Sequence, residues 1–184
     1  GMLVYSNTVV RQLGYGSGAT WPWVQFNNGA LRAWGYRNNI LVCKGDAGGK
    51  VMAIESTLNT PIDFTHNGWY PDGSFWWSTS GPSATSLAGI KAAMTATVPL
   101  FGGLTQRHAN DLISEADPFD TDVTLGATYD VQVTTEYEPS LQAGSVLLNA
   151  GVEIPGITDG FSGAAPDIGA VITGRAAPTV GDRS

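Results

Sequence analysis

The sequence has one cysteine, few charged residues and no long apolar run. Because Cys43 is the single cysteine among 184 residues, an internal disulfide and a zinc site built from cysteines are both excluded. Charged residues make up 14% of the chain and hydrophobic residues 42%, a balance that a disordered chain does not have. No apolar stretch reaches about 18 residues, so no transmembrane helix is expected. The length predicts one folded domain or at most two small ones.

Positive charge is also scarce. Nine Lys and Arg residues stand against 16 Asp and Glu residues, which gives a net charge of −7. This excess of negative charge would repel a nucleic-acid backbone or an anionic membrane surface. We therefore expect neither nucleic acid nor a membrane as a partner, whereas a neutral or metal-bridged sugar is compatible with the charge.

The first eighty residues consist of short β-type runs separated by clusters of Gly, Asn, Asp and Pro. The runs cover residues 4–10, 21–26, 30–34, 39–43, 50–55 and 62–64. None of them has helical periodicity, so their lengths predict a mainly β fold. Two architectures are open at this point: antiparallel hairpins, or a solenoid that brings successive strands into parallel register.

Two features of these runs favour different architectures. The Asn28-Gly29 and Asn67-Gly68 pairs are typical of hairpin turns. The continuous apolar run at residues 40–43 instead indicates a strand buried on both faces, as strands of parallel sheets are. The residue pattern alone leaves the choice open.

The second half of the chain is less regular. Residues 83–86 can cap a helix over residues 87–94, in which Leu87, Ile90 and Met94 have helical spacing. Further expectations are a short turn within residues 105–116, extended chain within residues 123–148 and a last strand over residues 165–172.

Four polar residues are predicted to shape the chain. Asn38 and Asn39 suit a left-handed corner between two strands, and stacked Asn side chains can bond each other along a solenoid. Asp117 precedes a proline, which favours extended geometry, and Asp167 can accept backbone N–H bonds in a turn.

Six segments, taken in chain order, resemble sequence elements of right-handed parallel β-helix proteins. They are residues 36–42, 62–70, 85–91, 108 with 117–119, 141–151 and 163–170. Together they resemble the C-terminal portion of the pectate-lyase-like superfamily, which includes polysaccharide lyases and glycoside hydrolases.

This resemblance implies a short right-handed parallel β-helix of about three coils, with a short helix and an irregular C-terminal region. Residues 2–80 would form the coils. Residues 81–174 would pack on them within the same domain, with residues 167–170 returning to the coil body, and residues 175–184 would be a tail. A solenoid coil takes roughly 20–30 residues, so the chain holds fewer coils than a full enzyme of the superfamily.

An aromatic cluster over residues 69–77 suggests a sugar-binding surface, because flat rings stack on the apolar faces of sugars. We expect Trp69 or Tyr70 to line such a site, with Asp63 or His66 nearby as hydrogen-bonding groups. In the competing interpretation, several of these rings fill the interior of the coils.

No pattern in the sequence predicts a catalytic centre. Glycoside hydrolysis needs two carboxylates facing one cleft, and lyase chemistry needs a base with charge stabilisation, often from Ca²⁺. The candidates are Asp63, His66, Asp72, Arg107, His108, Asp111, Asp120 and Asp122. None of them falls into a known zinc or calcium pattern, so no metal or cofactor is predicted, although Ca²⁺ is compatible with the composition. Enzymatic activity is left open, as are the roles of Arg107, His108 and Asp111.

These observations predict a carbohydrate-related β-helix module, either the C-terminal part or a shortened relative of a polysaccharide-degrading enzyme, that binds a glycan rather than cleaving it. The alternative is a non-catalytic, self-assembling structural module. The resemblance implies an extracellular or cell-surface location. Residues 3–10 would leave the first coil uncovered, which predicts a two-fold homodimer through that coil or, alternatively, cover by the chain's own C-terminal segment.

Overall fold

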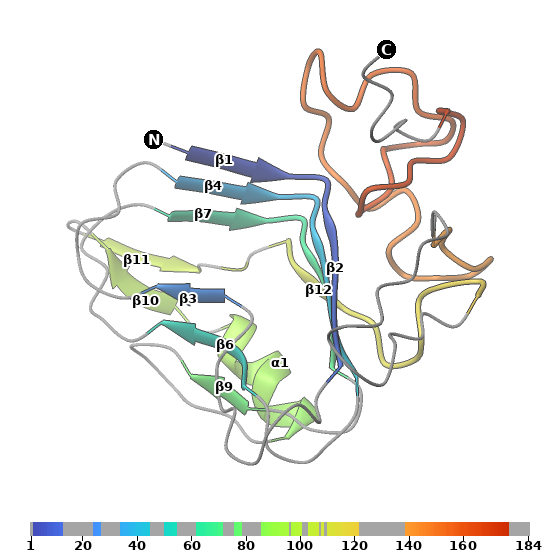
Figure 1. The fold of residues 1–184 in the computed structure, drawn as a ribbon. Helices are drawn as coiled ribbons and strands as arrows, with labels where there is room; N and C mark the ends of the chain where they lie inside the picture. Colours follow the sequence, from blue (N-terminus) through green and yellow to red (C-terminus); the bar gives the residue numbers. More distant parts are fainter. Residues whose placement is uncertain are drawn as a thin grey trace, which may run out of the picture.

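The computed structural model describes residues 2–12, 24–26, 34–44, 50–54, 62–71, 76–78, 86–95, 97–100, 103–106, 108, 110–121 and 139–176. These residues form a mainly β structure with parallel strands and little helix (Figure 1). The predicted mainly β class is therefore confirmed.

Strands of three parallel sheets recur in the same order along the chain. The first sheet contains β1 (Met2–Tyr5), β4 (Trp34–Arg37) and β7 (Ile62–Thr65). The second contains β2 (Thr8–Gln12), β5 (Ile40–Lys44), β8 (Gly68–Pro71) and β12 (Leu112–Ile113). The third contains β3 (Val24–Phe26), β6 (Lys50–Ile54) and β9 (Trp76–Ser78). The hairpin alternative is thus wrong for these strands, because each pairs in parallel with its counterpart one repeat later.

A two-residue corner joins the first sheet to the second in each repeat. The three corners are Ser6-Asn7, Asn38-Asn39 and His66-Asn67. Their first residues have φ angles of 48°, 55° and 56°, in the left-handed region that lets the chain turn sharply between two extended segments. The left-handed corner predicted at Asn38 is confirmed.

The second residues of the three corners and Asp111 form an asparagine ladder, defined here as Asn7, Asn39, Asn67 and Asp111. The backbone N–H and the side-chain amide of Asn7 both donate to Asn39 Oδ1, at 3.1 and 2.8 Å. Asn39 donates in the same way to Asn67 Oδ1, at 3.1 and 3.0 Å. Asn67 donates to Asp111 Oδ1, at 2.8 and 3.0 Å. The predicted stacking of asparagine side chains is therefore confirmed.

Both faces of the second sheet are covered along β5. Ile40, Leu41 and Val42 are at most 1% exposed, as predicted from the unbroken apolar run. The outer face carries a cluster of Ile40, Val42, Tyr70, Phe119, Leu147 and Ile168. Since strand side chains alternate, Leu41 and its register partner Trp69 point to the opposite face. Side chains of the repeated strands therefore bury one face of the second sheet, and side chains of the C-terminal segment bury the other.

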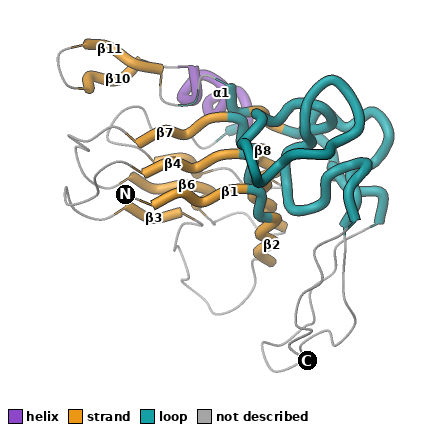
Figure 2. The backbone as a smooth tube through the Cα atoms, turned by 90° about the horizontal axis from the view of Figure 1, so that it is seen from above, coloured by secondary structure: helices purple, strands orange, loops and turns teal. Residues whose placement is uncertain are grey.

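The C-terminal segment, residues 139–176, forms turns and loops beside the second sheet (Figure 2). The predicted strand over residues 165–172 is wrong, because Gly169 has a φ of 116° and its N–H bonds the carbonyl of Asn38 at 2.8 Å instead of a strand. The expected extended chain is also wrong over residues 143–144 and 146–148, which form turns. Leu141 instead pairs with Phe119 in an isolated antiparallel bridge, and residues 122–138 lie outside the described part. The return of residues 167–170 onto the strands is confirmed.

The one helix of the described residues is α1 (Leu87–Thr95). Ser86 Oγ accepts a hydrogen bond from the N–H of Gly89 at 3.1 Å and caps the helix, which confirms this prediction, although residues 83–85 lie outside the described part. An antiparallel hairpin follows, made of β10 (Thr97–Leu100) and β11 (Gly103–Gln106). Residues 108 and 110 belong to the expected turn, and Asp111 N–H donates to His108 O at 3.2 Å.

Candidate functional site

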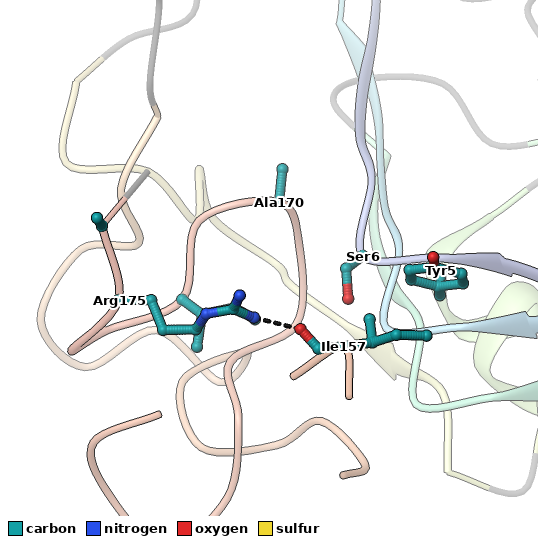
Figure 3. Close-up of a pocket in the computed structure, with 7 residues that line it drawn as sticks. Tyr5, Ser6, Ile157, Ala170 and Arg175 are labelled. Atoms are coloured by element: carbon teal, nitrogen blue, oxygen red, sulfur yellow. Dashed lines mark hydrogen bonds between the residues drawn. The ribbon is translucent and has the colours of Figure 1, made fainter. Parts of the chain in front are cut away.

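A pocket of about 220 Å³ lies where the C-terminal segment meets the first corner (Figure 3). It is lined by Tyr5, Ser6, Ile157, Ala170, Ile172, Arg175 and Ala176. One wall comes from the end of β1 and the corner after it, and the other from a segment more than 150 positions later in the chain. We call it the corner pocket.

The wall from the first corner supplies an aromatic ring and a hydroxyl. Tyr5 is 37% exposed, so part of its ring is free to contact a ligand. Ser6 turns inward at the corner, and its Oγ is buried with no hydrogen-bond partner among the described residues. A buried hydroxyl without a partner costs about 1–3 kcal/mol. A polar ligand atom or a water molecule next to Ser6 would recover that free energy.

The opposite wall supplies a guanidinium group. Arg175 donates from Nη1 to the carbonyl of Ile157, the contact drawn in Figure 3. Within the described residues, Arg175 has no carboxylate at ion-pair distance. The carbonyl contact orients the guanidinium, and its remaining N–H groups are available as donors.

Backbone hydrogen bonds hold this wall in place. Asp167 Oδ1 accepts from Asn149 N–H at 2.8 Å, and its Oδ2 accepts from the N–H and hydroxyl of Thr173 at 2.9 and 2.6 Å. Ala170 N–H donates to Thr8 Oγ1 at 3.1 Å. Asp167 therefore organises the loop that carries Ala170 and Ile172, in agreement with its predicted structural role. Asp117 Oδ1 likewise accepts a local bond, from Phe119 N–H at 3.0 Å.

The corner pocket is equipped for binding. The described residues that line it include no carboxylate and no histidine, so they supply neither the paired carboxylates nor the base that glycan cleavage needs. No group of three potential metal ligands occurs in the described part of the chain. A ring, a hydroxyl and a guanidinium are groups that fix the orientation of a small polar ligand.

None of the residues predicted to bind sugar lines the corner pocket. Trp69 is fully buried, and Tyr70, at 9% exposure, belongs to the outer-face cluster. His66 forms the third corner, with its Nδ1 2.8 Å from Thr65 Oγ1. Asp63 lies in β7 in register with Gly35, and its side chain is outside the described part. In this conformation Trp69 packs inside the sheets and has no ring face open to a sugar.

The second predicted group has a structural role where it is described. The side chains of Asp111 and His108 are buried, with His108 Nδ1 2.7 Å from Asp111 Oδ2. Trp69 Nε1 also donates to this oxygen, at 3.0 Å. The His108 ring stacks on Phe64, with centroids 5.1 Å apart. Asp111 thus completes the asparagine ladder and ties it to the aromatic interior.

The other candidates are either exposed or undescribed. Asp120 is exposed. Arg107, Asp72 and Asp122 lie outside the described residues.

No known family, curated protein or solved structure matches the chain. No helix in the described part is long and apolar enough to cross a membrane. The sequence did not predict the corner pocket. A signal was present, because Tyr5-Ser6-Asn7 precedes β2 in the same way that Arg37-Asn38-Asn39 precedes β5.

Proposed function

We propose that residues 2–78 form about three coils of a right-handed parallel β-helix and that the corner pocket of this module binds carbohydrate. The coil arrangement is supported by the parallel pairing of successive repeats in all three parallel sheets. It is also supported by the asparagine ladder, which repeats after 32 and then 28 positions. The second spacing lies within the roughly 20–30 residues typical of a solenoid coil, and the first is slightly longer.

The observation that carries the binding proposal is the meeting of Tyr5, Ser6 and Arg175 around one small pocket. A sugar unit offers a C–H face for the exposed part of the Tyr5 ring and several hydroxyls for the polar groups. One hydroxyl would satisfy the buried Ser6 Oγ, and another would accept from the Arg175 guanidinium. The pocket is smaller than the roughly 300–1,000 Å³ typical of drug-sized ligand sites, which favours a single sugar unit or the end of a glycan chain.

Binding is proposed here in preference to cleavage, because the described residues around the pocket contain no acid–base pair. The ligand would be a polysaccharide or oligosaccharide, and such substrates favour an extracellular or cell-surface location. This part of the proposal rests on the resemblance of the sequence to polysaccharide-processing β-helix proteins.

A glycan array followed by calorimetric titration with the best ligand tests the proposal. Arg175→Ala and Ser6→Ala should each weaken binding about tenfold, the equivalent of about 1.4 kcal/mol. Lys91→Ala removes an exposed cation that pairs with Glu115 and should leave the affinity unchanged. Equal affinity of all three variants, or no array ligand at all, would overturn the binding proposal.

Self-assembly through the first coil is a second candidate function. Leu3 and Tyr5 of β1 are 42% and 37% exposed, and β1 is an edge strand of the first sheet. A two-fold homodimer would cover this edge. Light scattering at several concentrations tests it, since a dimer doubles the mass whereas a monomer at all concentrations excludes this form of assembly.

A further inference from the structure

The first strands of the three parallel sheets all lie at sheet edges. The sheet orders place β1, β2 and β3 at the ends that β4, β5 and β6 follow. No described strand pairs with the outer side of β1 or β2, so backbone N–H and C=O groups along that side have no strand partner in the described part. Such an edge is a template for the addition of another strand.

The asparagine ladder shows what chemistry this edge is built to accept. Asn39 Oδ1, Asn67 Oδ1 and Asp111 Oδ1 each accept two hydrogen bonds from the preceding member of the ladder. Asn7 is exposed, and its Oδ1 accepts none in the described part of the chain. Its amide hydrogens donate to Asn39 Oδ1 and to Tyr5 O, both at 2.8 Å. Asn7 Oδ1 is therefore the one ladder oxygen of this series that lacks the two hydrogen bonds from a preceding member in the described part of the chain.

The opposite end of the ladder cannot supply those donors. Asp111 is a carboxylate, and its two oxygens accept from Asn67, Trp69 and His108. Its own N–H donates to His108 O. A second copy stacked head to tail would thus present no ladder donor to Asn7. In a two-fold pair, the Asn7 of the copy has already used its N–H and both amide hydrogens.

We propose that the edge formed by β1 and β2 docks a further parallel β coil whose corner presents an asparagine to Asn7 Oδ1. The N–H and side-chain amide of that asparagine would make the two hydrogen bonds seen at every other step of the ladder. Its flanking strands would pair with β1 and β2. The inference rests on the coil arrangement proposed above, and the two-fold homodimer is its competitor.

A coil borrowed from the chain itself provides the probe. Met2 and Ile62 hold the same register position, since both pair with Trp34 from opposite sides. Residues 34–61 fused directly before Met2 therefore place an added Asn39 one repeat before Asn7. The matched control is the same fusion with the added Asn39→Leu change, which keeps the length, the strands and the backbone N–H but removes the side-chain amide donor.

The fusion with asparagine should unfold with an equilibrium constant about tenfold smaller than that of the leucine control, and hydrogen exchange should slow in the amides of β1 and β2. Equal stability of the two fusions, failure of the added coil to fold, or unprotected β1 amides would overturn the inference. So would a two-fold dimer of the unfused chain that protects β1. Exchange in the unfused chain separates this result from the underlying proposal: fast exchange throughout β4 and β5 would reject the coil arrangement itself.

Discussion

The side chain of Asn38 makes two hydrogen bonds to the backbone of Val152, although the two residues are 114 positions apart. We call this pair of bonds the clasp. Asn38 Nδ2 donates to Val152 O at 2.7 Å, and Asn38 Oδ1 accepts from Val152 N–H at 2.8 Å. The same residue turns the second corner with a φ of 55°. One asparagine therefore shapes the strand repeat and anchors the C-terminal segment to it.

Replacing this clasp without changing the corner should loosen the C-terminal segment. Asn38→Gly retains access to positive φ and removes both side-chain bonds, so we expect a loss of about 1–3 kcal/mol in the free energy of unfolding. Proteolysis should then cut first within residues 139–176. Asn149→Gly is the control, because Asn149 also has positive φ but is exposed, and its side chain accepts a single local hydrogen bond, from Ala164 N–H at 3.1 Å. A loss no larger than that of the control would contradict a role for the clasp.

Gly169 should not tolerate a side chain. Its φ is 116°, and an added Cβ would lie 2.6 Å from Ile40 Cδ1 and 3.1 Å from Thr8 Oγ1. We expect Gly169→Ala to cost about 2–4 kcal/mol in urea unfolding and to weaken glycan binding at the adjoining corner pocket. Gly156→Ala has positive φ but open space around the added Cβ, so it should cost only about 1–2 kcal/mol. Similar losses for both variants would show that the close approach of Gly169 to the strands is unimportant.

Asp111 should be irreplaceable by its amide. Both of its oxygens accept hydrogen bonds, and its side chain is 0% exposed. Asp111→Asn replaces one accepting oxygen with an NH₂ group, which then faces hydrogen-bond donors and cannot accept from them. We therefore expect a loss of about 3 kcal/mol in the free energy of unfolding. Asp120→Asn, at an exposed position, should change stability by less than about 0.5 kcal/mol. Wild-type stability of Asp111→Asn would contradict its role as the terminal acceptor of the ladder.

Tyr36 should contribute to alkaline unfolding. Burial raises the pKa of its phenol above the usual value of 10.0, because the charged form is poorly solvated inside the fold. Above pH 10 the unfolded chain loses this proton before the folded chain does, so the stability tied to Tyr36 is present below pH 10 and is lost as the pH rises through the folded-state pKa. Urea unfolding between pH 9 and 11 should show a weaker pH dependence for Tyr36→Phe than for the unchanged protein. Parallel curves would contradict the shift.

By itself, the sequence determined the features that depend on neighbouring residues. The Asn38-Asn39 pair predicts a left-handed corner and a stacked side chain because asparagine tolerates that backbone and carries both donors and an acceptor. The apolar run through Ile40 predicts a strand buried on two faces, and the spacing of Leu87 and Ile90 predicts the helix. Each of these features is predicted by residues that belong to it or lie within a few positions of it.

Only the tertiary structure decided whether an aromatic residue lies in the core or at a binding site, and whether an extended-looking segment forms a strand or a loop. Trp69 could have stacked on a sugar, but the interior of the sheets buries it and Asp111 binds its Nε1. Residues 165–172 could have formed a strand, but their N–H groups bond Asn38 and Thr8. The corner pocket exists only because Arg175 is brought to Tyr5 and Ser6. Such contacts join segments 42 or more positions apart, and nothing in the local preferences of either segment encodes its partner.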